Sequence, residues 1–142
     1  MRCSSEWRMA NSELRATLSR PGSPKPTAPD IRSRSYEFAL RILRVVRALP
    51  RDPPTQVIAR QLTRAGTSVG ANVEEAQGSH SRREFARRMN IARSEARETL
   101  YWLRLLADSE TLPRRRMEKI LDEADQLVRV LVAIVKRTRE SP

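Results

Sequence analysis

One stretch, residues 66–84, constrains the fold of this chain more than any other. Its first part has the apolar spacing of a helix, yet it contains Gly66 and Gly70, each costing a helix about 1 kcal/mol relative to alanine. We interpret these glycines as a place where another backbone packs closely, with a kinked or frayed helix as the alternative. Gly78, expected in the left-handed conformation, and the Ser81–Glu84 capping box then predict a tight turn into a second helix. The stretch therefore predicts a helical hairpin.

Apolar residues recur with the period of a helix on both sides of this hairpin. The pattern predicts helices at about residues 31–49, 54–77 and 82–108, and from 113 to about 138. Their connectors are short, and short connectors make neighbouring helices antiparallel. Aromatic residues are only 4% of the chain, and no strand pattern is present. We predict an all-α, antiparallel up-and-down four-helix bundle over residues 31–139.

Residues 1–30 precede this pattern and are expected to form a flexible N-terminal extension. Its first part has the pattern of a weak helix at most, and the run 20–29 contains four prolines. Prolines at that density exclude a helix interior and predict a stiff, exposed linker. We assign the extension no function, and residues 1–30 are therefore separate from the predicted bundle.

The sequence favours a cytoplasmic protein. Cys3 is the only cysteine, so a disulfide framework within the chain is excluded and a reducing compartment is favoured. No apolar run approaches the roughly 20 residues that span a bilayer. The N-terminus also lacks the apolar region of a secretory signal. We expect no membrane partner.

The chain is strongly basic, which limits the kind of partner that it favours. Its formal net charge is +11 and its pI is about 11.3, values that favour polyanions such as nucleic acid or an acidic membrane face. Arginines with a regular spacing lie in the two C-terminal helices. The candidate nucleic-acid-binding residues are Arg83, Arg87, Arg97, Tyr101 and Arg104 on one helical line, with Arg114, Arg115 and Arg116 in the first turn of the last helix.

Both sets have a chemical reason to bind a ligand. The helical line interleaves arginine with Asn90, Ser94 and an aromatic ring, a combination that suits a phosphate backbone or an unstacked base. Cations in a first helical turn oppose the helix dipole, so stability does not explain the second set. A solvated polar face is the alternative for either set. We predict binding to RNA or another single-stranded nucleic acid, with little sequence readout.

Polar residues near the hairpin raise the question of a metal site or a catalytic site. Asn72 and Glu75 lie a turn apart on one predicted helix, and Glu95 and Glu98 a turn apart on the next. Carboxylate-bridged di-metal bundles also need two histidines, whereas His80 is the only one here. We therefore predict a structural polar cluster, paired with Arg93, Arg97 or an arginine of another subunit. No metal, cofactor or catalytic residue is predicted, and the protein is not expected to be an enzyme.

The C-terminal half of the third predicted helix is apolar nearly all round. A peripheral helix of one bundle is usually buried on one side only, so this segment indicates a second buried face. We predict a homo-oligomer with Leu100, Trp102 and Leu105 at the subunit interface.

Several motifs in a fixed order resemble a known family. They are Ser68-Val-Gly-Ala-Asn-Val-x-Glu75, then Ser81, Phe85, Ile91-Ala92, Glu95, Glu98-Thr99 and Tyr101-Trp102-Leu103. Over about residues 31–138 the chain resembles the small bacterial four-helix-bundle proteins first noticed in intervening sequences of large-subunit ribosomal RNA. Related to them is the accessory variability protein of diversity-generating retroelements. One departure is that many members place glycine directly after the glutamate, where this chain has Ala76, so the turn is expected later.

The resemblance implies an up-and-down bundle, often assembled as a pentamer with a basic surface, and no established enzymatic activity. The retroelement relative works with a reverse transcriptase and binds nucleic acid. The predicted function is thus that of a non-enzymatic, oligomeric accessory protein that binds nucleic acid, most plausibly RNA. The alternative is a protein–protein scaffold, for example a reverse transcriptase partner, without direct nucleic-acid binding.

Overall fold

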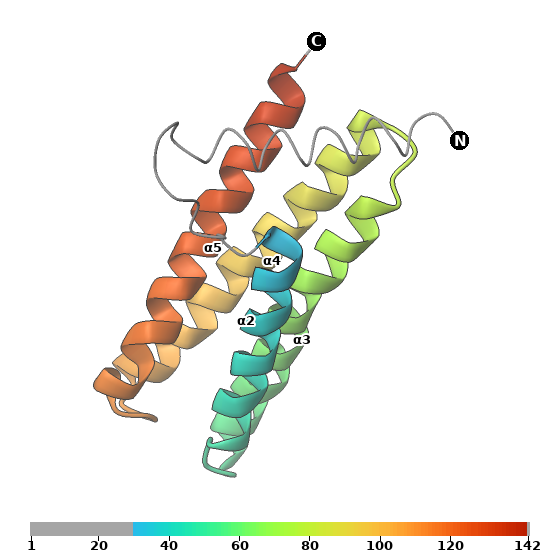
Figure 1. Cartoon of the computed structure of the whole chain (residues 1–142). Helices are drawn as coiled ribbons and strands as arrows, with labels where there is room; N and C mark the ends of the chain where they lie inside the picture. The colour runs from blue at the N-terminus through green and yellow to red at the C-terminus, as the bar shows by residue number, and fades with distance from the viewer. Residues whose placement is uncertain (1–29, 142) are drawn as a thin grey trace.

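The computed structural model describes residues 30–141, and the predicted N-terminal extension lies outside these residues, apart from Asp30. The described part contains α2 (Ile31–Arg47), α3 (Pro53–Gln77), α4 (Arg82–Asp108) and α5 (Arg114–Glu140), and no strand. Consecutive helices run antiparallel (Figure 1). The prediction of an all-α, up-and-down four-helix bundle is confirmed, and the helix bounds agree with the expected ranges to within a few residues.

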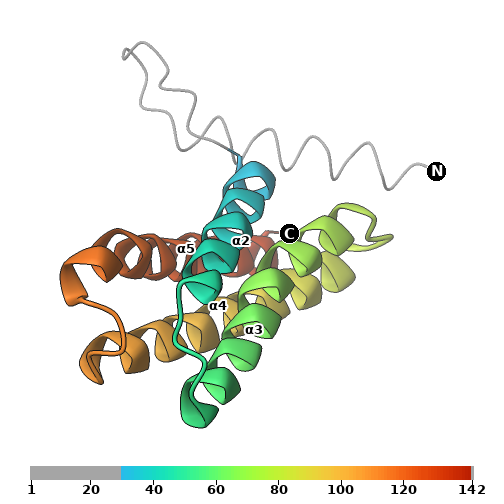
Figure 2. The same cartoon turned by 90° about the horizontal axis from the view of Figure 1, so that it is seen from below.

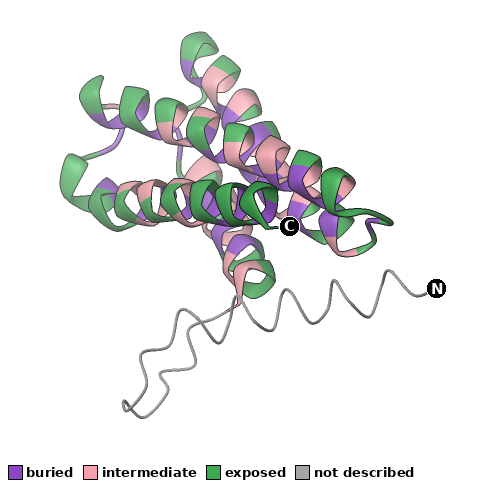
Figure 3. Ribbon diagram, turned by 90° about the horizontal axis from the view of Figure 1, so that it is seen from above, coloured by how far each residue is buried: buried purple, intermediate pink, exposed green. Residues whose placement is uncertain are grey.

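The helices are arranged around α4. Helices α3 and α5 pack along its two sides, whereas the shorter α2 packs mainly on α3 and meets α5 over a small area (Figures 1 and 2). Buried residues face the spaces between helices, and exposed residues cover the outer surface (Figure 3). One core cluster, around Ile42, Leu62 and Leu103, fills the end where α2 packs, and a second, around Val73 and Met89, fills the other end.

Side-chain caps fix where the first three helices begin. Asp30 accepts from the backbone N–H of Arg32 at 2.6 Å, and Asp52 accepts from Thr55. The hydroxyl and backbone N–H of Thr55 both donate to Asp52, which lowers the pKa of that carboxyl. At α4, the Ser81 hydroxyl accepts from the Glu84 N–H at 3.1 Å, as the predicted capping box requires.

The turn between α3 and α4 differs from the prediction in two details. Gly78 has a φ of −90°, so it is not in the left-handed conformation. The Glu84 carboxylate accepts from the backbone N–H of His80 at 3.0 Å, one residue before the expected donor. The helix therefore ends in a tightened turn, with the N–H of Gly78 bonded to the carbonyl of Glu75, and such a turn needs no positive φ.

The left-handed residue is instead Glu110, after α4, with a φ of 57°. Its N–H donates to the Ala107 carbonyl, and the N–H of Thr111 donates to the Leu106 carbonyl. These two bonds form a Schellman motif, a helix end that usually places glycine where this chain has Glu110. No local sequence signal indicates this helix end, because glutamate rarely adopts the left-handed conformation.

The glycines of α3 allow the close helix contact that the sequence indicates. A Cβ added to Gly66 would lie 2.8 Å from the Ile42 Cγ2 of α2, and one added to Gly70 would lie 3.4 Å from the Ser35 carbonyl oxygen. Both Ile42 and Ser35 are fully buried. The backbone of α2 therefore packs closely on Gly70, as predicted, whereas the side chain of Ile42 occupies the space beside Gly66. Helix α3 continues through both glycines as one helix.

Gly66→Ala is expected to lower the free energy of unfolding by about 1–3 kcal/mol, because the buried Ile42 has no space to move into. This loss would exceed the roughly 1 kcal/mol that alanine contributes to helix propensity. Chemical denaturation measures the difference. Gly78→Ala is the control, because its Cβ would meet only the Glu75 carbonyl oxygen at 3.7 Å. Equal effects of the two substitutions would contradict the close contact.

Glu110→Gly is expected to raise the free energy of unfolding by about 0.5–1 kcal/mol, since glycine adopts positive φ without steric cost. Thermal denaturation at fixed pH measures the change. Glu110→Ala removes the same carboxylate but keeps a Cβ, so it separates the backbone effect from the loss of charge. If Glu110→Ala stabilises the protein as much as Glu110→Gly, backbone strain is not the cause.

Candidate nucleic-acid interface

The outer line of α4 is exposed, as its helical spacing predicts. We define the α4 arginine line as the exposed residues Arg83, Arg87, Arg97 and Arg104, together with Tyr101. They lie on the side of α4 opposite the buried stripe that contains Met89, Ala96 and Leu103. Packing against α3 and α5 therefore leaves this line accessible to a ligand.

The arginines of this line differ in their partners from Arg32, Arg34 and Arg64, the arginines of α2 and α3 that pair across helices. Within residues 30–141, no ion pair involves Arg83, Arg87, Arg97 or Arg104. In contrast, Arg32 pairs with Glu74 at 2.9 Å, and Arg34 pairs with Glu123 at 2.8 Å. Acids of the same chain thus offset the charges of the arginines that join helices. No ion pair within the described residues offsets the charges of the arginines on the outside of α4.

Tyr101 adds an aromatic surface to this line. The residue is 56% exposed, and its ring meets Trp102 edge-on, with ring centroids 4.9 Å apart and planes at 70°. Trp102 packs against the core cluster, so it holds the tyrosine ring in place. A fixed, exposed ring between cations is a surface on which an unpaired base can stack.

The first turn of α5 carries the second predicted set. Pro113 is the N-cap and supplies no side-chain capping bond. Arg114 pairs with Asp108 of α4, so an interaction within the chain accounts for the position of this arginine. Arg115 and Arg116 are exposed and have no ion pair within the described chain. Two cations therefore remain at the positive end of the helix dipole without an acid to offset them.

The folded chain concentrates positive charge at one end of the α4–α5 face. In the first half of α5, residues 114–126, four basic residues are balanced by four acidic ones. The second half, residues 129–140, has four basic residues and one acid, and it packs against the arginine-rich first half of α4. The basic residues of this second half are Arg129, Lys136, Arg137 and Arg139. Sequence analysis missed them because the antiparallel pairing of α4 and α5 is what brings the two basic segments together.

The predicted polar cluster is brought together only in part. Glu95 and Glu98 share one partner, Arg64 of α3, with Arg64 Nη1 lying 3.2 Å from the Glu95 carboxylate. The hydrogen bond to Glu98 raises the pKa of the Arg64 guanidinium above its ordinary value. Asn72 instead donates to the Ser68 carbonyl of its own helix at 2.9 Å, and Glu75 is exposed.

The partner of these glutamates is therefore not one of the arginines that the sequence suggested. Arg93 donates to the Asn90 side chain at 2.9 Å, and Arg97 belongs to the outer line. Arg64 was missed because it lies 31 residues before Glu95. Across residues 30–141, no group of three or more His, Cys, Asp or Glu side chains lies close enough to hold a metal ion.

The apolar segment of α4 is largely accounted for by neighbours in the same chain. Leu100 and Trp102 are partly buried against the core cluster, because α4 lies between α3 and α5. Leu105 is 37% exposed. The prediction of a second buried side assumed that this helix lies at the periphery of the bundle. Because α4 lies between α3 and α5, both helices bury it within the same chain. None of the helices in the described region is long and apolar enough to cross a membrane.

Comparison with known proteins agrees with this architecture. A family model described as "23S rRNA-intervening sequence protein" matches residues 29–133. A crystal structure of a protein of unknown function from the S23 ribosomal protein family of Bacteroides thetaiotaomicron has a TM-score of 0.70 and 38% sequence identity, covering 75% of this chain and 98% of its own. The chain matches none of the curated proteins with which it was compared. The matched span includes nearly all of the bundle, and the resemblance noted in the sequence is confirmed: this chain belongs to the 23S rRNA-intervening sequence protein family.

Proposed function

We propose that this protein is a non-enzymatic, cytoplasmic accessory protein that binds RNA through the outer surface of α4. The observation that carries the proposal is the alignment of four exposed arginines without an ion pair on one face of α4, beside the exposed Tyr101. A charge without an internal partner adds little to folding stability, so its position is better explained by an external anion. The family description, which refers to ribosomal RNA, agrees with this partner class.

Phosphate groups are the expected main contact. Arginine binds phosphate through two parallel hydrogen bonds, and such contacts carry no sequence information. Tyr101 adds a stacking surface that accepts any unpaired base. This combination favours single-stranded RNA over a duplex, with little preference for a particular sequence.

We further propose that the protein acts as a homo-oligomer, a pentamer in the arrangement that the family resemblance suggests. Val57 and Leu105 are exposed apolar side chains on adjacent helices, at 49% and 37% exposure, and they support a contact between copies. Oligomerisation would repeat the α4 arginine line, so that weak phosphate contacts add through avidity. Light scattering at micromolar concentration should give a multiple of 16.3 kDa, and a monomer at that concentration would contradict this part of the proposal.

The same exposed apolar residues also favour a second candidate function, a scaffold that binds another protein such as a reverse transcriptase. The two candidates respond differently to salt. Binding to a protein through apolar side chains changes little with ionic strength, whereas binding to RNA through phosphates weakens steeply.

The double variant Arg87→Glu/Arg97→Glu is expected to bind single-stranded RNA more weakly and with a shallower salt dependence. Each phosphate contact removed should reduce the log–log slope by about 0.7, because fewer counterions are released on binding. Fluorescence anisotropy with a labelled oligouridine at several salt concentrations measures the slope. Arg44→Glu/Arg47→Glu is the matched control, since it changes the net charge equally at two exposed arginines of α2.

Identical slopes for the two double variants would show that the α4 arginine line is only a solvated surface and does not bind RNA. If the wild-type protein fails to bind RNA even at low salt, the scaffold function takes its place. Circular dichroism and light scattering on both variants establish that the fold and the oligomeric state are unchanged.

A further inference from the structure

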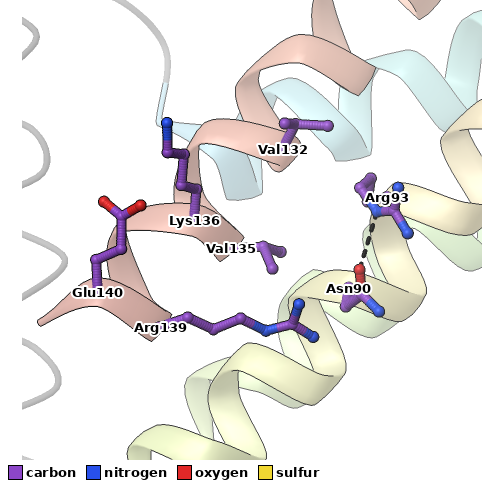
Figure 4. A pocket seen from close by; sticks show the side chains of 7 residues that line it. All are labelled: Asn90, Arg93, Val132, Val135, Lys136, Arg139 and Glu140. Carbon is purple, nitrogen blue, oxygen red and sulfur yellow. Dashed lines mark hydrogen bonds between the residues drawn. The ribbon is translucent and has the colours of Figure 1, made fainter.

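A groove of about 400 Å³ lies between the first half of α4 and the last turns of α5 (Figure 4). It opens on the face where the two basic segments meet. The residues that line it are Asn90 and Arg93 of α4 and Val132, Val135, Lys136, Arg139 and Glu140 of α5. Of these residues, sequence analysis connected only Asn90 with nucleic-acid binding, as a polar residue within the helical line.

The groove combines an apolar floor with a cationic rim. Val135 is almost fully buried and Val132 is 39% exposed, so the floor between the helices is hydrocarbon. Arg93, Lys136 and Arg139 contribute three positive charges against the single carboxylate of Glu140. A ligand that fits must therefore present an apolar face to the floor and negative charge to the rim.

The side chains at the rim are arranged to meet a ligand from both helices. Arg93 Nε donates to Asn90 Oδ1 at 2.9 Å, which orients the guanidinium and uses the amide oxygen of Asn90 but not its N–H groups. In Figure 4, Arg139 extends from α5 across the groove toward Asn90. Within the described residues, neither Lys136 nor Arg139 takes part in an ion pair.

We propose that this groove holds one unpaired nucleotide of single-stranded RNA, with its base over Val132 and Val135 and its phosphate on the surrounding cations. The proposal rests on the RNA-binding function proposed above and adds the site that distinguishes a single strand from a duplex. A base is a flat apolar surface with polar edges, which the valine floor and the Asn90 amide can meet together. Guanidinium planes such as that of Arg139 also stack on bases.

A duplex cannot use this groove in the same way. Its bases are paired and stacked inside the helix, so a duplex presents phosphates, sugars and base edges to the groove but no free base face. A single strand that follows the α4 arginine line passes directly beside the groove, because Arg97 lies one helical turn from Arg93. The groove can therefore receive a base from a strand whose backbone is already bound.

An acidic amphipathic peptide is the competing occupant, and the geometry favours it less. A helix bound in a groove needs apolar anchors over about two turns. This floor offers two valines within a single turn of α5, which suits one base better than a row of side chains.

The test compares Val132→Glu with Ala71→Glu, which introduces the same charge at an exposed apolar residue of α3, outside the groove and outside the proposed contact between copies. Both side chains are exposed, so both variants are expected to fold. The probes are a labelled oligouridine and the blunt duplex that it forms with oligoadenylate. Val132→Glu should weaken binding of the single strand about tenfold and of the duplex by no more than about threefold. Ala71→Glu should change either affinity by less than about twofold.

An equal loss for both probes in Val132→Glu would overturn the proposal, because the groove would then act only through its charge. Unchanged binding of both probes would overturn it as well. In that case, binding of a labelled glutamate–leucine peptide by the wild-type protein but not by Val132→Glu would assign the groove to a protein partner. Failure of the wild-type protein to bind either RNA probe at low salt would instead reject the RNA-binding function on which the proposal rests.

Discussion

The central position of α4 is the constraint on which the rest of the structure depends. A helix flanked by two others must bury two sides, and α4 does so with Met89, Ala92 and Leu103 toward the core and Leu100 and Trp102 toward its neighbours. The side of α4 that stays exposed to solvent is narrow, and it carries the α4 arginine line. The most buried helix of the bundle is thus also the one that presents the candidate binding surface, so its position is fixed by packing on both sides. A binding surface on such a helix is held rigidly, which limits the entropy lost when a ligand binds.

Much of the fold could be predicted from the sequence because helix bounds depend on local signals. Apolar spacing, the caps Asp30 and Ser81, and Pro50 after the first helix each act within a few residues. What could not be predicted depends on the pairing of distant segments. Arg64 reaches glutamates 31 and 34 residues away, and the groove requires the antiparallel register of α4 and α5. The left-handed conformation of Glu110 could not be predicted for another reason. The two backbone hydrogen bonds that end α4 outweigh the steric preference of glutamate for a negative φ.

The arginines fall into two groups that the composition alone does not distinguish. Arg34 forms two hydrogen bonds to the Glu123 carboxylate and one to Gln126, and this partly buried contact raises the pKa of its guanidinium. Such arginines fix the register of one helix against another. Those on the outer side of α4 do not contribute to the fold in this way. The structural pairs are locally neutral, so the net positive charge of the chain comes from the arginines and lysines without an acidic partner, such as those on the outer side of α4.

The contact between α2 and α5 has a consequence for how the bundle assembles. The three extensive packing contacts all join helices that are consecutive in the chain, whereas the small α2–α5 contact, which includes the Arg34–Glu123 pair, joins the first described helix to the last. The fold therefore has a low contact order, which is associated with folding in microseconds to milliseconds. Hairpins can form in succession, and docking of α2 near Glu123 is the step that joins segments far apart in sequence. We expect hydrogen exchange to be fastest in α2 and slowest in α4, so that the helix at the edge opens while the surface of the central helix stays intact.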